Sequence, residues 1–101
     1  MQKSLGILVS SDKHLDKLIG ICEAARIKNV IVYIFLTHFG VILTQDSNFH
    51  KLEGLASISV CNVNFEKFNL KPPIPGIKEK DYATQTRNAI MVTDCDRYIV
   101  L

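Results

Sequence analysis

Apolar residues along this chain form short continuous runs that are separated by segments of helical periodicity. Residues 5–9 form one apolar run ended by turn-forming residues, and residues 30–35 form a second that is rich in β-branched and aromatic side chains. A third segment, residues 57–61, is Ser-Ile-Ser-Val-Cys and is also expected to form a strand. Continuous apolar runs of this length are typical of strands buried on both faces of a parallel sheet. We therefore expect three buried strands.

Helical patterns fill the segments between the predicted strands. Over residues 15–28 apolar side chains recur at helical spacing, and Asp12 or Ser11 is placed to cap the first turn. Residues 49–55 predict a shorter helix, with apolar side chains on a common face. Residues 82–93 contain neither Gly nor Pro and predict the last long helix. Strands and helices therefore alternate along the chain.

The remaining segments complete this pattern. Residues 41–43 are expected to form a short helical turn that packs back on the sheet, because Thr37 supplies a cap before them. Residues 71–76 include all three prolines of the chain and a glycine, which break regular structure and so predict a surface loop. Residues 97–101 are expected to form a terminal strand.

Alternation of this kind predicts an α/β fold in which right-handed crossovers join parallel strands. We expect a three-layer α/β/α arrangement around a mainly parallel sheet of about four to five strands. A chain of 101 residues with 48% hydrophobic and 22% charged residues has ordinary globular composition. One domain over residues 1–101 is therefore expected.

Charge and hydropathy exclude several classes of protein. The net charge of +2 is small, and no run of Lys and Arg is interleaved with aromatic residues, so nucleic acid is not an expected partner. Residues 78–81 alternate in sign, as on a solvated face. The longest apolar run, residues 30–36, is much shorter than the ~20 residues of a membrane helix, and the N-terminus lacks a secretory pattern. We expect a cytoplasmic protein without membrane contact.

Metals and cofactors are not expected. The three cysteines form no CxxC pair, so they predict neither a zinc site nor a disulfide framework, and a reducing compartment suits them. Gly-rich nucleotide fingerprints are absent. Residues 11–14, Ser-Asp-Lys-His, offer charge and bulk where a flavin phosphate needs small residues.

The carboxyl ends of parallel strands meet at one edge of a sheet, where α/β proteins collect ligands and chemistry. Residues 10–12, 37–40 and 61–64 are predicted to gather there, which assembles a thiol, hydroxyls, a carboxylate and an imidazole. The candidate catalytic residue is Cys61. The candidate substrate-binding residues are Ser10, Asp12, Thr37, His38, Gly40 and Asn62.

Cys61 ends an apolar run just before residues 62–70, which can start a helix. Unpaired backbone amides at a helix start stabilise a thiolate, the reactive form of cysteine. The alternative is that Cys61 completes a buried strand as an inert small hydrophobe. His38 presents a similar choice between general acid or base chemistry near Cys61 and a loop histidine bound by backbone carbonyls.

The other two cysteines are expected to be structural. Cys22 falls on the apolar stripe of the first helix. Cys95 lies between Asp94 and Asp96, whose carboxylates are expected to raise the pKa of its thiol by disfavouring a second negative charge. The functional question therefore depends on Cys61.

Three segments of the chain resemble parts of a known family. Residues 34–41, Ile-Phe-Leu-Thr-His-Phe-Gly-Val, run from an apolar strand into a turn with Thr and Gly. Residues 58–61, Ile-Ser-Val-Cys, are followed by Asn62 and a short helix, and residues 93–101 form a helix-to-strand turn. These segments resemble the second strand, the cysteine strand and the final turn of DsrE/DsrF-like proteins. The resemblance spans nearly the whole chain.

The resemblance implies a small α/β subunit, often oligomeric, in a group that includes sulfur-relay proteins with persulfide sulfur on this cysteine. The first hypothesis is thus a sulfur carrier or sulfurtransferase-related protein that uses Cys61 as persulfide acceptor and has sulfur-relay partners. The alternative is a non-catalytic small-ligand-binding or interaction subunit in which Cys61 is inert. A homo-oligomer is expected in either case, because apolar edge strands are commonly covered by symmetric partners.

Overall fold

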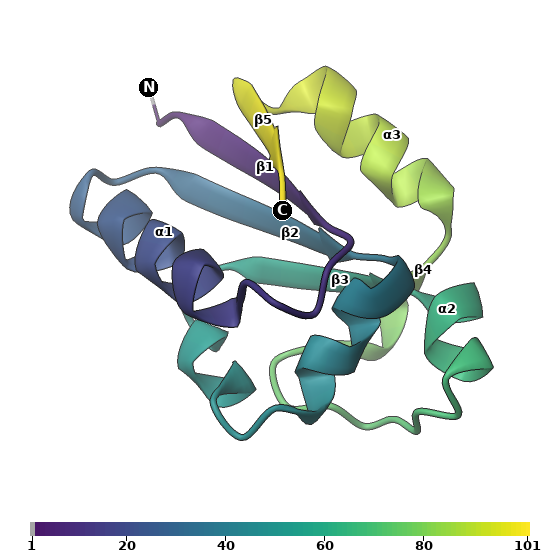
Figure 1. Ribbon diagram of the computed structural model, residues 1–101. Coiled ribbons are helices and arrows are strands. Elements are labelled where there is room, and N and C mark those ends of the chain that lie inside the picture. The colour runs from purple at the N-terminus through teal and green to yellow at the C-terminus, as the bar shows by residue number, and fades with distance from the viewer. Residues whose placement is uncertain (1) are drawn as a thin grey trace.

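The computed structural model describes residues 2–101 and contains one five-stranded sheet in which all neighbouring strands are parallel (Figure 1). In sheet order the strands are β4 (Tyr82–Ala83), β3 (Ser57–Cys61), β2 (Ile31–Leu36), β1 (Ser4–Val9) and β5 (Arg97–Val100). The expected strands at residues 5–9, 30–35, 57–61 and 97–101 are confirmed within a residue at each end. The α/β fold class is therefore confirmed.

Helical segments connect the strands. The α-helices are α1 (Leu15–Ile27), α2 (Asn62–Lys67) and α3 (Gln85–Asp94), and the 3-10 helices are η1 (His38–Gln45), η2 (Phe49–Leu52) and η3 (Glu79–Asp81). The helix expected over residues 15–28 and the helical turn expected after Thr37 are both present, the latter as η1. The proline-rich loop of residues 71–76 lies between α2 and η3 and has no regular structure.

Helices cover both faces of the sheet and give three layers (Figure 1). On one face α1, η1 and η2 pack against alternate strand residues, and the main core includes Leu18, Ile34 and Val60. On the other face α3 contributes Met91, which packs with Phe35 and Cys61 in a smaller core. The two cores are separated by the sheet itself, because successive strand side chains point to opposite faces.

Two local expectations are wrong. Residues 82 and 83 do not begin a helix but form β4, in which Tyr82 and Ala83 pair with Val60 and Cys61, and α3 begins only at Gln85. A two-residue strand is too short to leave a periodic pattern, so tertiary pairing overrides the helical propensity of this segment. The helix expected over residues 49–55 is also shorter than expected and ends at Leu52.

Neither expected cap forms as proposed. The first helix has His14 at its N-cap without a side-chain hydrogen bond, so Asp12 and Ser11 do not cap it. The Ser11 hydroxyl instead accepts a hydrogen bond from the Lys13 amide at 3.2 Å. Thr37 does precede η1, but its hydroxyl makes no cap bond and is directed elsewhere. The Ser11 hydroxyl thus bonds a local amide outside the helix, whereas the Thr37 hydroxyl bonds residues that are distant in sequence.

Candidate functional site

A polar network joins three elements at the carboxyl edge of the sheet. The hydroxyl of Thr37, which follows β2, donates to Oδ1 of Asn64 on α2 at 3.0 Å. The His38 amide donates to the same oxygen at 2.9 Å. The side-chain amide of Gln85, the first residue of α3, donates to the Thr37 hydroxyl at 2.9 Å. This network fixes the end of β2 to both following helices.

The network engages the Thr37 hydroxyl fully within the protein. The Thr37 side chain is 2% exposed, and its hydroxyl both donates and accepts a hydrogen bond within the protein. Asn64 and Gln85 were not among the predicted site residues, because nothing in their local sequence distinguishes them from surface amides. The strand-end argument correctly brought residues 37–40 and 61–64 together, but it did not identify which side chains meet.

Gly40 is required by a close approach of two backbone segments. A Cβ at position 40 would lie 2.1 Å from the carbonyl oxygen of Val9, closer than any unbonded carbon and oxygen can come. The turn at the start of η1 therefore packs directly onto the end of β1. His38 begins this turn with a φ of 49° and leaves its side chain exposed. Gly40 is thus a packing position, whereas His38 remains open to solvent.

Cys61 is buried, in contrast to the reachable thiol that sulfur transfer requires. The residue ends β3 immediately before α2, as predicted, but its side chain is 3% exposed. It packs with Phe35 and Met91, and Leu8 and Tyr98 lie against the same cluster. The alternation of β3 places Cys61 on the face that α3 covers, and the sequence alone does not say which face that is.

The other two thiols are held in the protonated form. Burial raises the pKa of Cys22 to about 11, and the neighbouring Glu23 carboxylate adds to the shift. Burial also raises the pKa of Cys95, the Asp94 and Asp96 carboxylates raise it further, and a hydrogen bond with Ser4 opposes these effects. The pKa of Cys95 is therefore raised, as predicted, but burial is a larger cause than the two carboxylates. All three cysteines are free.

The remaining predicted site residues line three different pockets. Ser10 and Asp12 line a pocket of about 390 Å³ together with the exposed ring of Phe39, and Asp12 also lines a second hollow of about 300 Å³ beside it. Asn62 lines a larger pocket of about 600 Å³, which we call the loop pocket. Its walls are α2, the loop of residues 70–73, and residues 77–82. The predicted residues are thus divided between separate hollows.

The loop pocket has mainly apolar walls with a few polar groups. Phe65 on α2 and Tyr82 on β4 form an edge-to-face pair with ring centroids 5.3 Å apart. The Tyr82 hydroxyl accepts a hydrogen bond from the Ile74 amide at 3.1 Å, which attaches the proline-rich loop to the sheet. Ile74 and Ile77 are buried in the main core. These contacts hold the outer wall of the pocket in place.

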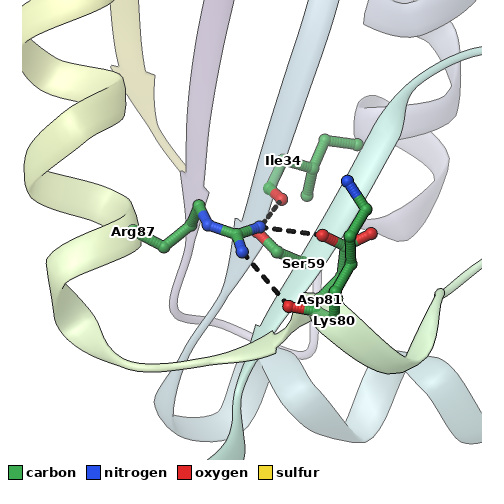
Figure 2. Close-up of polar contacts among 5 residues, drawn as sticks. All are labelled: Ile34, Ser59, Lys80, Asp81 and Arg87. Carbon is green, nitrogen blue, oxygen red and sulfur yellow. Dashed lines mark hydrogen bonds and ion pairs between the residues drawn. The ribbon is translucent and has the colours of Figure 1, made fainter.

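Sequence reasoning also missed an ion pair on the opposite side of β4, between a buried carboxylate and a half-buried guanidinium. Nη1 of Arg87 on α3 lies 2.9 Å from Oδ1 of Asp81, which is 7% exposed, and Nη2 donates to the Lys80 carbonyl at 3.2 Å (Figure 2). Beside this pair the Ser59 hydroxyl donates to the Ile34 carbonyl at 3.1 Å. The pair attaches the first turn of α3 to the segment that leads into β4.

The burial of Asp81 corrects the expectation that residues 78–81 form a solvated face. Lys78, Glu79 and Lys80 are exposed, but Asp81 points inward. Charged side chains are almost never fully buried unless they are paired, and Arg87, the only charged residue in α3 before Asp94, is the partner of Asp81. No signal in the local sequence shows that Asp81 is the buried member of residues 78–81.

Over residues 2–101 the structure contains no cluster of three or more His, Cys, Asp or Glu side chains suited to a metal ion. The helices in the same residues are all too short or too polar to cross a bilayer. Comparison of the chain with family models, curated proteins and solved structures found no match. The function must therefore be argued from the geometry of the chain itself.

We predict that Arg87→Met destabilises the protein by about 1.5 to 3 kcal/mol, because it leaves the Asp81 carboxylate buried without its charged partner. Urea denaturation would measure the change in the free energy of unfolding. The double variant Arg87→Met with Asp81→Asn should lose less than the sum of the two single variants, since it removes both charges. Additive losses, or a loss below about 0.5 kcal/mol for Arg87→Met, would show that the pair behaves as an exposed ion pair.

Proposed function

We propose that this protein is a non-catalytic subunit that binds a small ligand in the loop pocket. The observation that carries the proposal is the pocket itself. Its volume of about 600 Å³ lies within the range of small-molecule sites, and its walls combine apolar side chains with a few polar groups. It opens beside Asn62, directly after the end of β3, where α/β proteins commonly bind ligands.

The pocket is held in place before any ligand binds. The Tyr82 hydroxyl anchors the Ile74 amide, and the buried side chains of Ile74 and Ile77 fix the loop on both sides of residues 75–76. A preformed site avoids the entropic cost of ordering a loop during binding. The two hollows beside Asp12 are smaller, at about 300 and 390 Å³.

The burial of Cys61 supports the choice of a binding subunit over a sulfur carrier. A persulfide must reach a donor and an acceptor protein, and a thiol that is 3% exposed beneath α3 offers neither access nor room for a second sulfur atom. The proposal keeps the DsrE/DsrF-like resemblance for the type of subunit and treats Cys61 as a packing residue. Sulfur transfer on Cys61 is the competing hypothesis.

A cytoplasmic location is part of the same proposal. All three cysteines are free, including the half-buried Cys95. Free thiols persist in a reducing compartment and are oxidised or paired outside it.

We also propose that the protein forms a homo-oligomer through α3 and β5. The strand β5 lies at one edge of the sheet and pairs only with β1 (Figure 1). Its Val100 side chain is exposed, and so are Ile90 and Val92 on the adjacent α3. An unpaired strand edge beside apolar side chains is a surface that a symmetric second copy can cover.

The ligand proposal is tested by two-dimensional amide NMR of the labelled protein with a mixture of small aromatic and aliphatic fragments. We expect the largest chemical-shift changes at the amides of Asn62, Glu66, Ile77 and Tyr82. Leu70→Trp should abolish these changes because the indole fills the pocket, whereas Ile27→Trp, at an exposed position at the end of α1, should leave them unchanged. Shift changes confined to residues 10–13, or none at all, would contradict the proposal.

Thiol labelling separates the two roles of Cys61. With iodoacetamide near neutral pH and peptide mass mapping, we expect native protein to be modified at Cys95 alone, and Cys22 and Cys61 to react only in urea. Labelling of Cys95 should be slower than that of a free thiol and should accelerate as the pH is raised, because its raised pKa leaves little thiolate at neutral pH. Rapid modification of native Cys61, or a sulfur adduct on it after exposure to a persulfide donor, would restore the carrier hypothesis.

Light scattering after size exclusion tests the assembly. We expect a mass greater than that of the 11.4 kDa chain, and we expect Val92→Glu to reduce it, because a charge at the contact would be desolvated without a partner. The control is Val63→Glu, which changes another exposed valine, on α2. A monomer mass at every concentration would refute the assembly and leave the ligand proposal untouched.

A further inference from the structure

The loop pocket carries an excess of negative charge. Its charged lining consists of the carboxylates of Glu66 and Glu79 and the ammonium group of Lys71. The chain as a whole has a net charge of +2, so the acidic excess is a local property of the pocket. All three side chains are exposed, so their charges act on a ligand mainly at short range and are screened by salt.

Both carboxylates are free to pair with a ligand. Among residues 2–101 the only ion pair joins Arg87 to Asp81, so neither Glu66 nor Glu79 has a cationic side chain within 4.0 Å. Glu66 is also oriented, because Oε1 accepts a hydrogen bond from the Asn62 side-chain amide at 3.1 Å. Its second carboxylate oxygen remains available as an acceptor.

The walls beside these carboxylates are aromatic and aliphatic. Tyr82 supplies a half-buried ring, Phe65 packs edge-to-face with it and is only 1% exposed, and Leu70 and Pro72 add apolar surface. The negative face of an aromatic ring attracts a cation, so Tyr82 and the carboxylates favour the same kind of ligand. The apolar surface itself favours a ligand with a hydrocarbon body.

We infer that the loop pocket selects an apolar organic cation, in which an ammonium group is attached to an aromatic or aliphatic body. The body packs against Leu70, Pro72 and Tyr82, and the ammonium group lies between the carboxylates of Glu66 and Glu79. This inference rests on the proposed function, which states that the pocket binds a small ligand. It adds the chemical class of that ligand. Lys71 is the opposing charge, and its removal should strengthen binding.

Three probes of matched size and different charge test the inference on the intact chain. They are phenethylammonium, phenethyl alcohol and hydrocinnamate, and each is titrated into the labelled protein while the pocket amides are followed by NMR. We expect phenethylammonium to bind more tightly than the alcohol, and hydrocinnamate to bind most weakly. Since exposed charge pairs are screened, the preference for the cation should shrink as the salt concentration is raised.

Charge-removing variants assign the preference to named residues. Glu66→Gln and Glu79→Gln should each weaken phenethylammonium binding about two- to fivefold and leave the alcohol unchanged. Glu66→Gln keeps an oxygen that can accept the hydrogen bond from Asn62, so it removes the charge without removing the contact. Lys71→Gln should tighten binding of the cation. Glu23→Gln, on exposed α1, is the matched control and should change nothing.

The outcomes distinguish the inference from the function on which it rests. Equal binding of the cation and the alcohol, or tighter binding of hydrocinnamate, would overturn the cation class while the pocket remained a ligand site. Loss of affinity in Glu23→Gln equal to that in Glu66→Gln would also overturn it, because the effect would then be one of net charge. Failure of all three probes to shift the pocket amides would refute the pocket as a small-ligand site.

Discussion

Parallel pairing of β1 with both β2 and β5 is the constraint on which the rest of the molecule depends. The register places Gly6 beside Tyr33 and Tyr98, and Ile7 beside Ile34 and Ile99, so each layer of side chains continues across the sheet. Because strand side chains alternate, this one register assigns every inward residue to the α1 face or to the α3 face. It also brings all carboxyl strand ends to one edge, where the polar network forms.

At the carboxyl edge, the two faces of the sheet differ in whether a pocket is left open. On the α1 face, the side chains of Phe65 and Tyr82 leave a pocket beneath the proline-rich loop. On the α3 face, Cys61 and Phe35 are sealed by Met91. The residues Val60 and Cys61 are neighbours in sequence, yet they belong to separate cores. The chemistry available at a strand end is therefore decided by the helix that covers each face.

The sequence predicted the elements well because each depends on local pattern. Apolar runs and helical spacing located four strands and α1 within a residue or so, since burial on both faces or on one stripe leaves a clear periodicity. The missed features depend on distant partners. The strand β4 exists through pairing with Val60 and Cys61, the Thr37 hydroxyl bonds Asn64 instead of capping η1, and Asp81 is buried because Arg87 reaches it from α3.

The candidate site could also be predicted only where it depends on local sequence. The strand-end rule located the edge and included Asn62, which does line the loop pocket. It could not show that Cys61 is covered, because coverage depends on the path of α3, nor that the loop of residues 71–76 folds back to form a wall through the Ile74 amide and Tyr82. Chain topology, rather than residue chemistry, separates the predicted site from the observed pocket.

Gly40 has a consequence for how this sequence can vary. The smallest possible side chain at this position would occupy the space already filled by the Val9 carbonyl, so any replacement must push η1 away from the end of β1. In a library with every substitution at every position, residue 40 would tolerate as little change as the fully buried Ile34, although it contributes no side chain to the core. If descendants of this chain keep a glycine at position 40, the reason would be the lack of space beside the backbone of Val9 rather than contact with a ligand.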